Sequence, residues 1–244
     1  MDFFEGEVLA FDKPYEWTSF GIVAKVRWLL TQHLGRKIKV GHAGTLDPLA
    51  TGIVLLCTGK ATKRIEELQA GEKEYTATLR LGATTASFDL EHPVDATYPT
   101  DHITEDAVRQ ALRRFEGDIE QVPPAFSACK IEGRRAYALA RKGKDVSLSA
   151  KPIHIAAIEL TGCRLPDEID IRVVCSKGTY IRALARDIGQ ALGSGAHLTA
   201  LRRTRVGDYR IADCMTLESF EQWLAAQPVA TTSLQTNTNK PTQI

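Results

Sequence analysis

Residues 41–57 read GHAGTLDPLATGIVLLC. The first part is a glycine-rich segment that carries one carboxylate, Asp47, directly before Pro48. Glycine permits backbone conformations and close approaches that other residues resist, whereas proline fixes its own φ and drives the preceding residue towards an extended conformation. The last part, Gly52 to Cys57, is an apolar run of strand length. The segment therefore predicts a stiff loop that presents Asp47 and is anchored by a buried strand.

The composition is that of a packed globular protein. The chain has 244 residues, of which 43% are hydrophobic, and a formal net charge of +1 from 31 basic and 30 acidic residues. This length fits one large domain or two small ones. Five cysteines without paired spacing favour reduced thiols in a cytoplasmic protein over a disulfide framework or a zinc site. The N-terminal residues contain neither a signal peptide nor a membrane span.

Hydrophobic periodicity predicts an alternation of strands and helices, and therefore the α+β class. Clean alternation predicts a strand at 73–81, with Tyr75 on its apolar face. The other expected strands are 8–11, 52–57, 153–160 and 169–175. The expected helices are one that follows a cap at Thr18 or Ser19, then 61–69, 104–115, one capped by Thr179, and 217–226. After Pro228 the composition turns to Thr, Ser, Gln and Asn, which predicts a disordered polar tail over 229–244.

Positive charge gathers in two segments although the whole chain is nearly neutral. No acidic residue occurs between Ile22 and Leu46, where five lysines and arginines lie. Between Lys130 and Lys151 seven basic residues stand against two acidic ones. Such segments suit a phosphate backbone, although each is also compatible with a solvated surface.

The run from Gly41 to Gly52 closely resembles the catalytic motif of the TruB family, the bacterial tRNA pseudouridine-55 synthases. The resemblance covers roughly Val8 to Thr216. In the segment that begins Asp12-Lys13-Pro14, Glu16 stands where the family usually has glycine. Further segments that resemble family motifs are Leu81–Asp89, Gln121–Lys130, Gly178–Arg182 and Leu201–Arg203.

The resemblance implies the pseudouridine synthase fold, a mixed and largely antiparallel sheet flanked by helices. It assigns 1–228 to the catalytic domain and about 121–152 to a basic, thumb-like insertion that grips RNA. Many family members carry a C-terminal RNA-binding PUA domain after the catalytic domain, and we expect none here.

The resemblance also assigns roles to individual residues. Asp47 is the expected catalytic residue, and Arg182 is expected to pair with it. The first turn of a helix disfavours a positive charge, so an arginine there calls for an anionic partner. The other expected substrate contacts are Tyr75, which stacks on the target base; His42, which fills the space that the base leaves; Tyr180, which assists removal of the C5 proton; and Lys130 and Arg141, which bind RNA in the insertion.

The implied reaction converts the T-loop uridine at position 55 of tRNA to pseudouridine after base flipping. The base is detached at N1–C1′ and rejoined through C5, so no electron or phosphate moves and no metal or cofactor is expected. The expected partner is the T-arm stem-loop of tRNA, without guide RNA or membrane, and the expected state is a cytoplasmic monomer.

Three other functions compete with this one. A glycoside hydrolase also acts at an anomeric carbon, but it normally uses two carboxylates, and the glycine-rich motif has only Asp47. A guide-RNA-dependent synthase of archaeal and eukaryotic type shares these motifs. An RNA-folding factor would bind tRNA without chemistry, although the joint presence of Asp47, Tyr75 and Arg182 argues against that.

Overall fold

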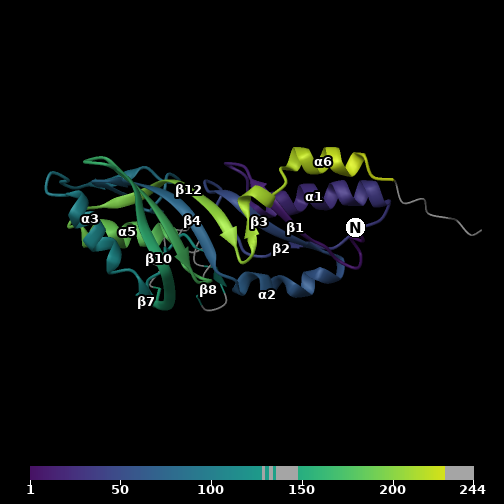
Figure 1. The fold of residues 1–244 in the computed structure, drawn as a ribbon, viewed down its shortest axis with the longest axis horizontal. Helices are drawn as coiled ribbons and strands as arrows, with labels where there is room; N and C mark the ends of the chain where they lie inside the picture. The colour runs from purple at the N-terminus through teal and green to yellow at the C-terminus, as the bar shows by residue number, and fades with distance from the viewer. Residues whose placement is uncertain (128–129, 132–133, 136–147, 229–244) are drawn as a thin grey trace, which may run out of the picture.

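A computed structural model describes residues 1–127, 130–131, 134–135 and 148–228. These residues form an elongated molecule built on a nine-stranded sheet in the order β1-β3-β12-β4-β11-β10-β7, with β2 on β3 and β13 on β12 (Figure 1). The strands of this sheet are β1 (Val8–Lys13), β2 (Val40–His42), β3 (Thr51–Thr58), β4 (Lys73–Leu81), β7 (Gly117–Gln121), β10 (Lys151–Arg164), β11 (Glu168–Cys175), β12 (Ala196–Val206) and β13 (Tyr209–Arg210).

The pairing of the strands is antiparallel except between β3 and β12. The α+β class and the mixed, largely antiparallel sheet predicted from the sequence are therefore confirmed. In β4 the predicted alternation is present, because Tyr75, Ala77 and Leu79 are buried while Thr76 and Arg80 are exposed. The short strands β5 (Ala83–Thr85) and β6 (Val94–Thr97) form a separate pair.

The helices gather at the two ends of the sheet (Figure 1). At one end lie α1 (Ser19–Leu34), α2 (Ile65–Ala70), which follows the 3₁₀ turn η1 (Gly59–Arg64), and α6 (Leu217–Ala225), which follows η2 (Ile211–Asp213). At the other end lie α3 (Glu105–Arg113) and α5 (Ile181–Ala191). The side chain of Thr18 caps α1 by accepting from the Gly21 amide, and Thr104 caps α3 in the same way. No described helix is long and apolar enough to cross a membrane.

Strand β12 was not predicted from the sequence, although it lies between β3 and β4 near the middle of the sheet. Its pairing with β4 is interrupted by two irregularities, one between Leu198 and Ala200 and one between Arg203 and Arg205. A bulge inserts an extra residue and breaks the alternation of side chains. The run Leu-Arg-Arg-Thr-Arg therefore lacks the period of two by which a strand is recognised.

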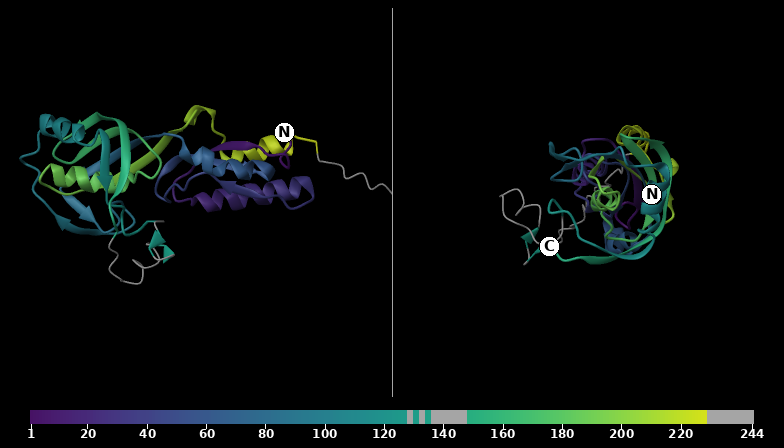
Figure 2. Two further views of the ribbon diagram at one scale, coloured as in Figure 1. Left: turned by 90° about the horizontal axis from the view of Figure 1, so that it is seen from below. Right: turned by 90° about the vertical axis from the view of Figure 1, so that its left-hand side faces the viewer.

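The predicted insertion connects two neighbouring strands, because Gln121 at the end of β7 pairs with Lys151 at the start of β10. Within it, β8 (Lys130–Ile131) and β9 (Arg134–Arg135) form a small pair that projects from one side of the molecule (Figure 2, left). Arg141 and the predicted tail at 229–244 lie outside the described residues. The extent and role of the insertion and the domain boundary at 228 stay predictions.

Glu16 occupies the turn in which the TruB motif usually has glycine. Its φ is 64°, in the left-handed region, and its amide donates to the Pro48 carbonyl at 3.0 Å. A side chain in this conformation costs about 1–2 kcal/mol, whereas glycine adopts it without strain. The turn is therefore formed with glutamate, but under strain.

We predict that Glu16→Gly raises the free energy of unfolding by about 0.5–1 kcal/mol, because relief of the strain exceeds the added chain entropy of glycine. Glu16→Ala is the control, since it removes the charge but keeps the Cβ and therefore the strain. Urea denaturation with an unchanged slope measures both variants. Equal stability of the two variants would show that the left-handed backbone carries no cost here.

Candidate active site

The loop that carries Asp47 connects β2 to β3. It closes with a turn in which the Ala50 amide donates to the Asp47 carbonyl at 3.1 Å, with Pro48 at the second position. At its far end Gly52 pairs with Arg203 of β12 and has a φ of 104°. A Cβ at this position would overlap the backbone of Arg203. Glycine is therefore required where the loop enters the sheet.

The Asp47 carboxylate is paired with Arg182, in the first turn of α5. The Nε of Arg182 donates to the Oδ2 of Asp47 at 2.8 Å, and the aspartate side chain remains 39% exposed while the arginine is buried. The other two nitrogens donate to the carbonyls of Ser87 at 3.1 Å and Phe126 at 3.0 Å. Two carbonyls thus hold the guanidinium, and its third hydrogen bond orients a carboxylate that solvent can reach.

A second carboxylate, Asp89, lies beside the same arginine. Its Oδ2 is 3.6 Å from the Nε of Arg182, and its Oδ1 accepts from the amide of Glu91 at 3.0 Å. Its side chain is only 9% exposed. Asp89 therefore belongs to the electrostatic environment of Asp47, but it is far less accessible.

Lys13 braces the Asp47 loop from β1. Its ammonium is fully buried and donates to the carbonyls of Pro14 at 2.9 Å, Trp17 at 2.6 Å and Pro48 at 3.0 Å. Burial lowers the pKa of Lys13 to about 8. The side chain of Ser19 adds a second brace, since its hydroxyl bonds both the amide and the carbonyl of Leu46.

Arg203 braces the loop from β12 and is 2% exposed. Its Nε donates to the Ile53 carbonyl at 2.8 Å, and its terminal nitrogens donate to the carbonyls of Thr45 and Gly44 at 3.3 and 3.4 Å. It is also the cross-strand neighbour of Tyr75. Burial raises the pKa of Tyr75, and the nearby positive charge of Arg203 opposes the rise.

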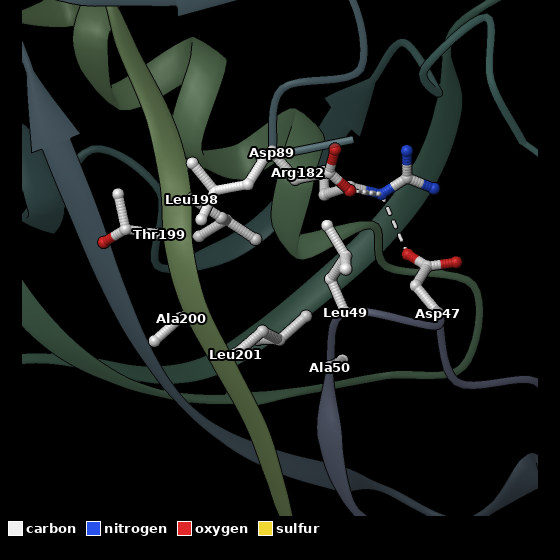
Figure 3. A pocket seen from close by; sticks show the side chains of 10 residues that line it. Asp47, Leu49, Ala50, Asp89, Arg182, Leu198, Thr199, Ala200 and Leu201 are labelled. Carbon is white, nitrogen blue, oxygen red and sulfur yellow. Dashed lines mark hydrogen bonds and ion pairs between the residues drawn. The ribbon is translucent and has the colours of Figure 1, made fainter. Parts of the chain in front are cut away.

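A pocket that is open to solvent lies beside Asp47 and Arg182 (Figure 3). Its remaining lining comes from Leu49, Ala50, Asp89, Leu90 and residues 198–201 of β12. Of the residues predicted for the site, the structure therefore brings Asp47 and Arg182 together at this pocket. The described residues contain no cluster of three His, Cys, Asp or Glu side chains that could hold a metal.

Of the other predicted residues, Tyr75, His42 and Tyr180 do not line this pocket. Tyr75 is buried on β4, and His42 ends β2, where burial lowers the pKa of its ring. Tyr180 is the N-cap residue of α5, and its amide and carbonyl both bond the side chain of Gln121. The predicted cap at Thr179 is therefore wrong. Lys130 begins β8.

Comparison with protein families identifies the chain. A model described as TruB family pseudouridylate synthase (N terminal domain) matches residues 30–181, and a model described as tRNA pseudouridylate synthase B C-terminal domain matches residues 182–236. The chain belongs to the TruB family. The boundary between the two matched regions lies at the start of α5. Strand β12, in the second region, pairs with β3 and β4, in the first.

Similar proteins agree with this TruB assignment. A tRNA pseudouridine synthase B of Phocaeicola vulgatus is 67% identical over 94% of this chain and 97% of that relative. One of Mycobacterium bovis is 45% identical over 93% of this chain and 74% of that relative. The chain is thus an isomerase of the pseudouridine synthase class.

Solved structures show the same fold. A chain in a Cbf5-Nop10-Gar1 complex superimposes with a TM-score of 0.68 at 31% identity, over 91% of this chain and 55% of that one. A chain in an H/ACA RNP bound to a substrate RNA containing 2'-deoxyuridine superimposes with a TM-score of 0.62 at 29% identity, over 88% of this chain and 52% of that one. The present chain spans about half the length of these relatives. The predicted pseudouridine synthase fold is confirmed.

We predict that Arg203→Lys lowers the free energy of unfolding by about 2 kcal/mol, because one ammonium cannot occupy the positions of the three guanidinium nitrogens that bond Ile53, Thr45 and Gly44, so buried carbonyls lose their donors. The matched control is Arg202→Lys on the same strand. Arg202 is half-buried and pairs with Asp12 at 2.7 Å. Exposed or half-exposed pairs contribute about 0–1 kcal/mol. Similar shifts in the two denaturation midpoints would contradict a special role of Arg203 in holding the loop.

Proposed function

We propose that this TruB chain converts the T-loop uridine at position 55 of tRNA to pseudouridine, with Asp47 as its catalytic residue. The observation that carries the proposal is the Asp47 carboxylate itself. It is solvent-accessible, fixed by the buried Arg182, and set on a loop braced by Lys13 and Arg203. The names of the similar proteins, tRNA pseudouridine synthase B, support tRNA as the substrate.

The reaction is an isomerisation. The N1–C1′ bond of uridine breaks and a C5–C1′ bond forms; the proton on C5 is lost and N1 gains a proton. Asp47 acts as nucleophile or base towards the nucleotide, which is a role that an ionised carboxylate fills. Tyr75 stacks on the flipped base, His42 occupies the space that it leaves in the RNA loop, and Tyr180 assists loss of the C5 proton. Lys130 and Arg141 bind phosphates from the insertion.

Two carboxylates, Asp47 and Asp89, line the pocket, and a glycoside hydrolase also uses two. Such enzymes need two carboxyl groups that both reach the substrate. Asp89 is buried, accepts from a backbone amide and faces Arg182. These contacts favour a fixed electrostatic role for Asp89 over that of an acid or base, which leaves Asp47 as the sole proposed catalytic carboxylate.

We predict that the protein alone releases tritium from a T-arm hairpin that contains 5-tritiated uridine, because joining C1′ to C5 must expel the hydrogen on C5. No guide RNA, metal or nucleotide is added. Release that occurs only after addition of a guide RNA would favour a guide-dependent synthase. Free uracil among the products would favour a hydrolase.

We predict that Asp47→Asn lowers turnover by several powers of ten, since an amide neither attacks nor accepts the proton. Binding of tRNA should persist, because most protein–RNA contacts lie elsewhere. Asp89→Asn is the matched control, as it removes the second carboxylate beside the same arginine. A melting curve for each variant separates stability from chemistry. A folded Asp47→Asn protein with near wild-type turnover would remove Asp47 from the mechanism.

A further inference from the structure

Helix α1 exposes an aromatic stripe that the proposed reaction does not use. Phe20 is 64% exposed and Trp28 is 55% exposed, and Ala24 between them is exposed too. These residues are four apart, so they lie above one another on one side of the helix. Trp17 precedes the helix and is also exposed, with its ring near Gly21 in the first turn. We call residues Trp17, Phe20, Ala24 and Trp28 the α1 aromatic face.

This face is not the side by which α1 packs on the protein. The helix already buries Ile22, Val23, Val26 and Leu30 in the core. The opposite side of a surface helix normally carries polar residues. Large aromatic side chains grouped on a surface mark a site of interaction. Two of the three tryptophans of the chain belong to this face.

Positive charge accompanies the aromatic rings. The ammonium of Lys25 lies 5.1 Å from the centre of the Trp28 ring, and the guanidinium of Arg27 lies 5.9 Å from that of Phe20. Lys25 also forms an ion pair with Glu221 of α6 at 3.2 Å, so a carboxylate adjoins the face on the side of α6. Beyond the end of α1 the exposed cations continue; they are Arg36, Lys37 and Lys39.

The α1 aromatic face starts at the catalytic loop. Lys13 donates to the Trp17 carbonyl and to the Pro48 carbonyl, and Ser19 bonds the backbone of Leu46. From there the helix runs for 16 residues, a length of about 24 Å. An RNA whose target nucleotide reaches Asp47 therefore has further nucleotides within range of this face.

We propose that the α1 aromatic face binds unpaired bases of the tRNA that lie beyond the T-arm. This inference rests on the proposed function. Exposed aromatic rings stack on unpaired bases, and neighbouring lysines and arginines contact the phosphates, which is the usual composition of a surface for unpaired RNA. A face for a second copy of the chain would not need the run of cations without acidic residues from Ile22 to Leu46.

The test is the double variant Phe20→Ala with Trp28→Ala, studied with full-length tRNA and with a T-arm hairpin. Both side chains are exposed, so the fold should persist, and a melting curve checks this. Loss of one stacked base corresponds to about a tenfold change in affinity. We expect Kd and KM for full-length tRNA to rise about tenfold, with kcat unchanged and with values for the hairpin within twofold of wild type. Val94→Ala, an exposed apolar residue on β6, is the control.

Three outcomes would overturn the inference. One is equal affinity of variant and wild type for full-length tRNA, and another is an equal loss for hairpin and tRNA. The third is a wild-type dimer in sedimentation that the variant abolishes while RNA affinity is unchanged, since the face would then bind a second copy. Kd is measured apart from turnover. Absence of tritium release from either RNA would therefore count against the proposed reaction, while the two Kd values still decide on the α1 aromatic face.

Discussion

The position of Asp47 depends on two buried cations that bond backbone carbonyls. Lys13 of β1 and Arg203 of β12 have no carboxylate within ion-pair distance among the described residues, and together they hold the carbonyls of Gly44, Thr45, Pro48 and Ile53. A buried charge without compensation is costly, so these carbonyls must stay in place for the cations to be stable. The constraint is therefore mutual. The loop carbonyls accept the hydrogen bonds that the buried cations need, and these bonds hold the loop in place. Burial also lowers the pKa of Lys13.

Arg182 links this fixed loop to two other segments. Besides Asp47 it holds the carbonyl of Ser87, in the segment that leads to Asp89, and that of Phe126, at the root of the insertion. The same root is attached to α5 by Gln121, which bonds both backbone groups of Tyr180, and by Arg186, which donates to Val122. A displacement of the insertion root on RNA binding thus changes contacts of the guanidinium that orients the carboxylate. The segment that grips RNA and the carboxylate that acts as the catalytic group, both in the proposed function, therefore contact the same side chain, Arg182.

The sequence predicted those parts of the structure whose cause is local. Alternation identified β4, and the apolar run after Gly52 identified β3, because both depend on which residues face the core. The positive charge at Arg182 in a first helical turn predicted an anionic partner, and Asp47 is that partner. Every residue has a backbone carbonyl, so hydrogen bonds to carbonyls produce no pattern of residue types in the sequence. For this reason neither Lys13 nor Arg203 was recognised as a brace. Asp89 ends the Leu81–Asp89 motif that was noted, yet only the fold shows that this segment returns to Arg182.

The parallel pair β3 and β12, the only one among the described strands, explains why the site lies where it does. Strands β3 and β12 meet only at Thr51 with Arg202 and at Gly52 with Arg203. Through this short contact the β1–β3 half, with α1 and α6, joins the half that carries α3 and α5 (Figure 1). Asp47 precedes the contact by a few residues and therefore sits at the seam between the halves. A ligand that contacts both α1 and the insertion must cross that seam, which brings its central part to the carboxylate. A polymer can make both contacts at once, which agrees with RNA as the proposed substrate.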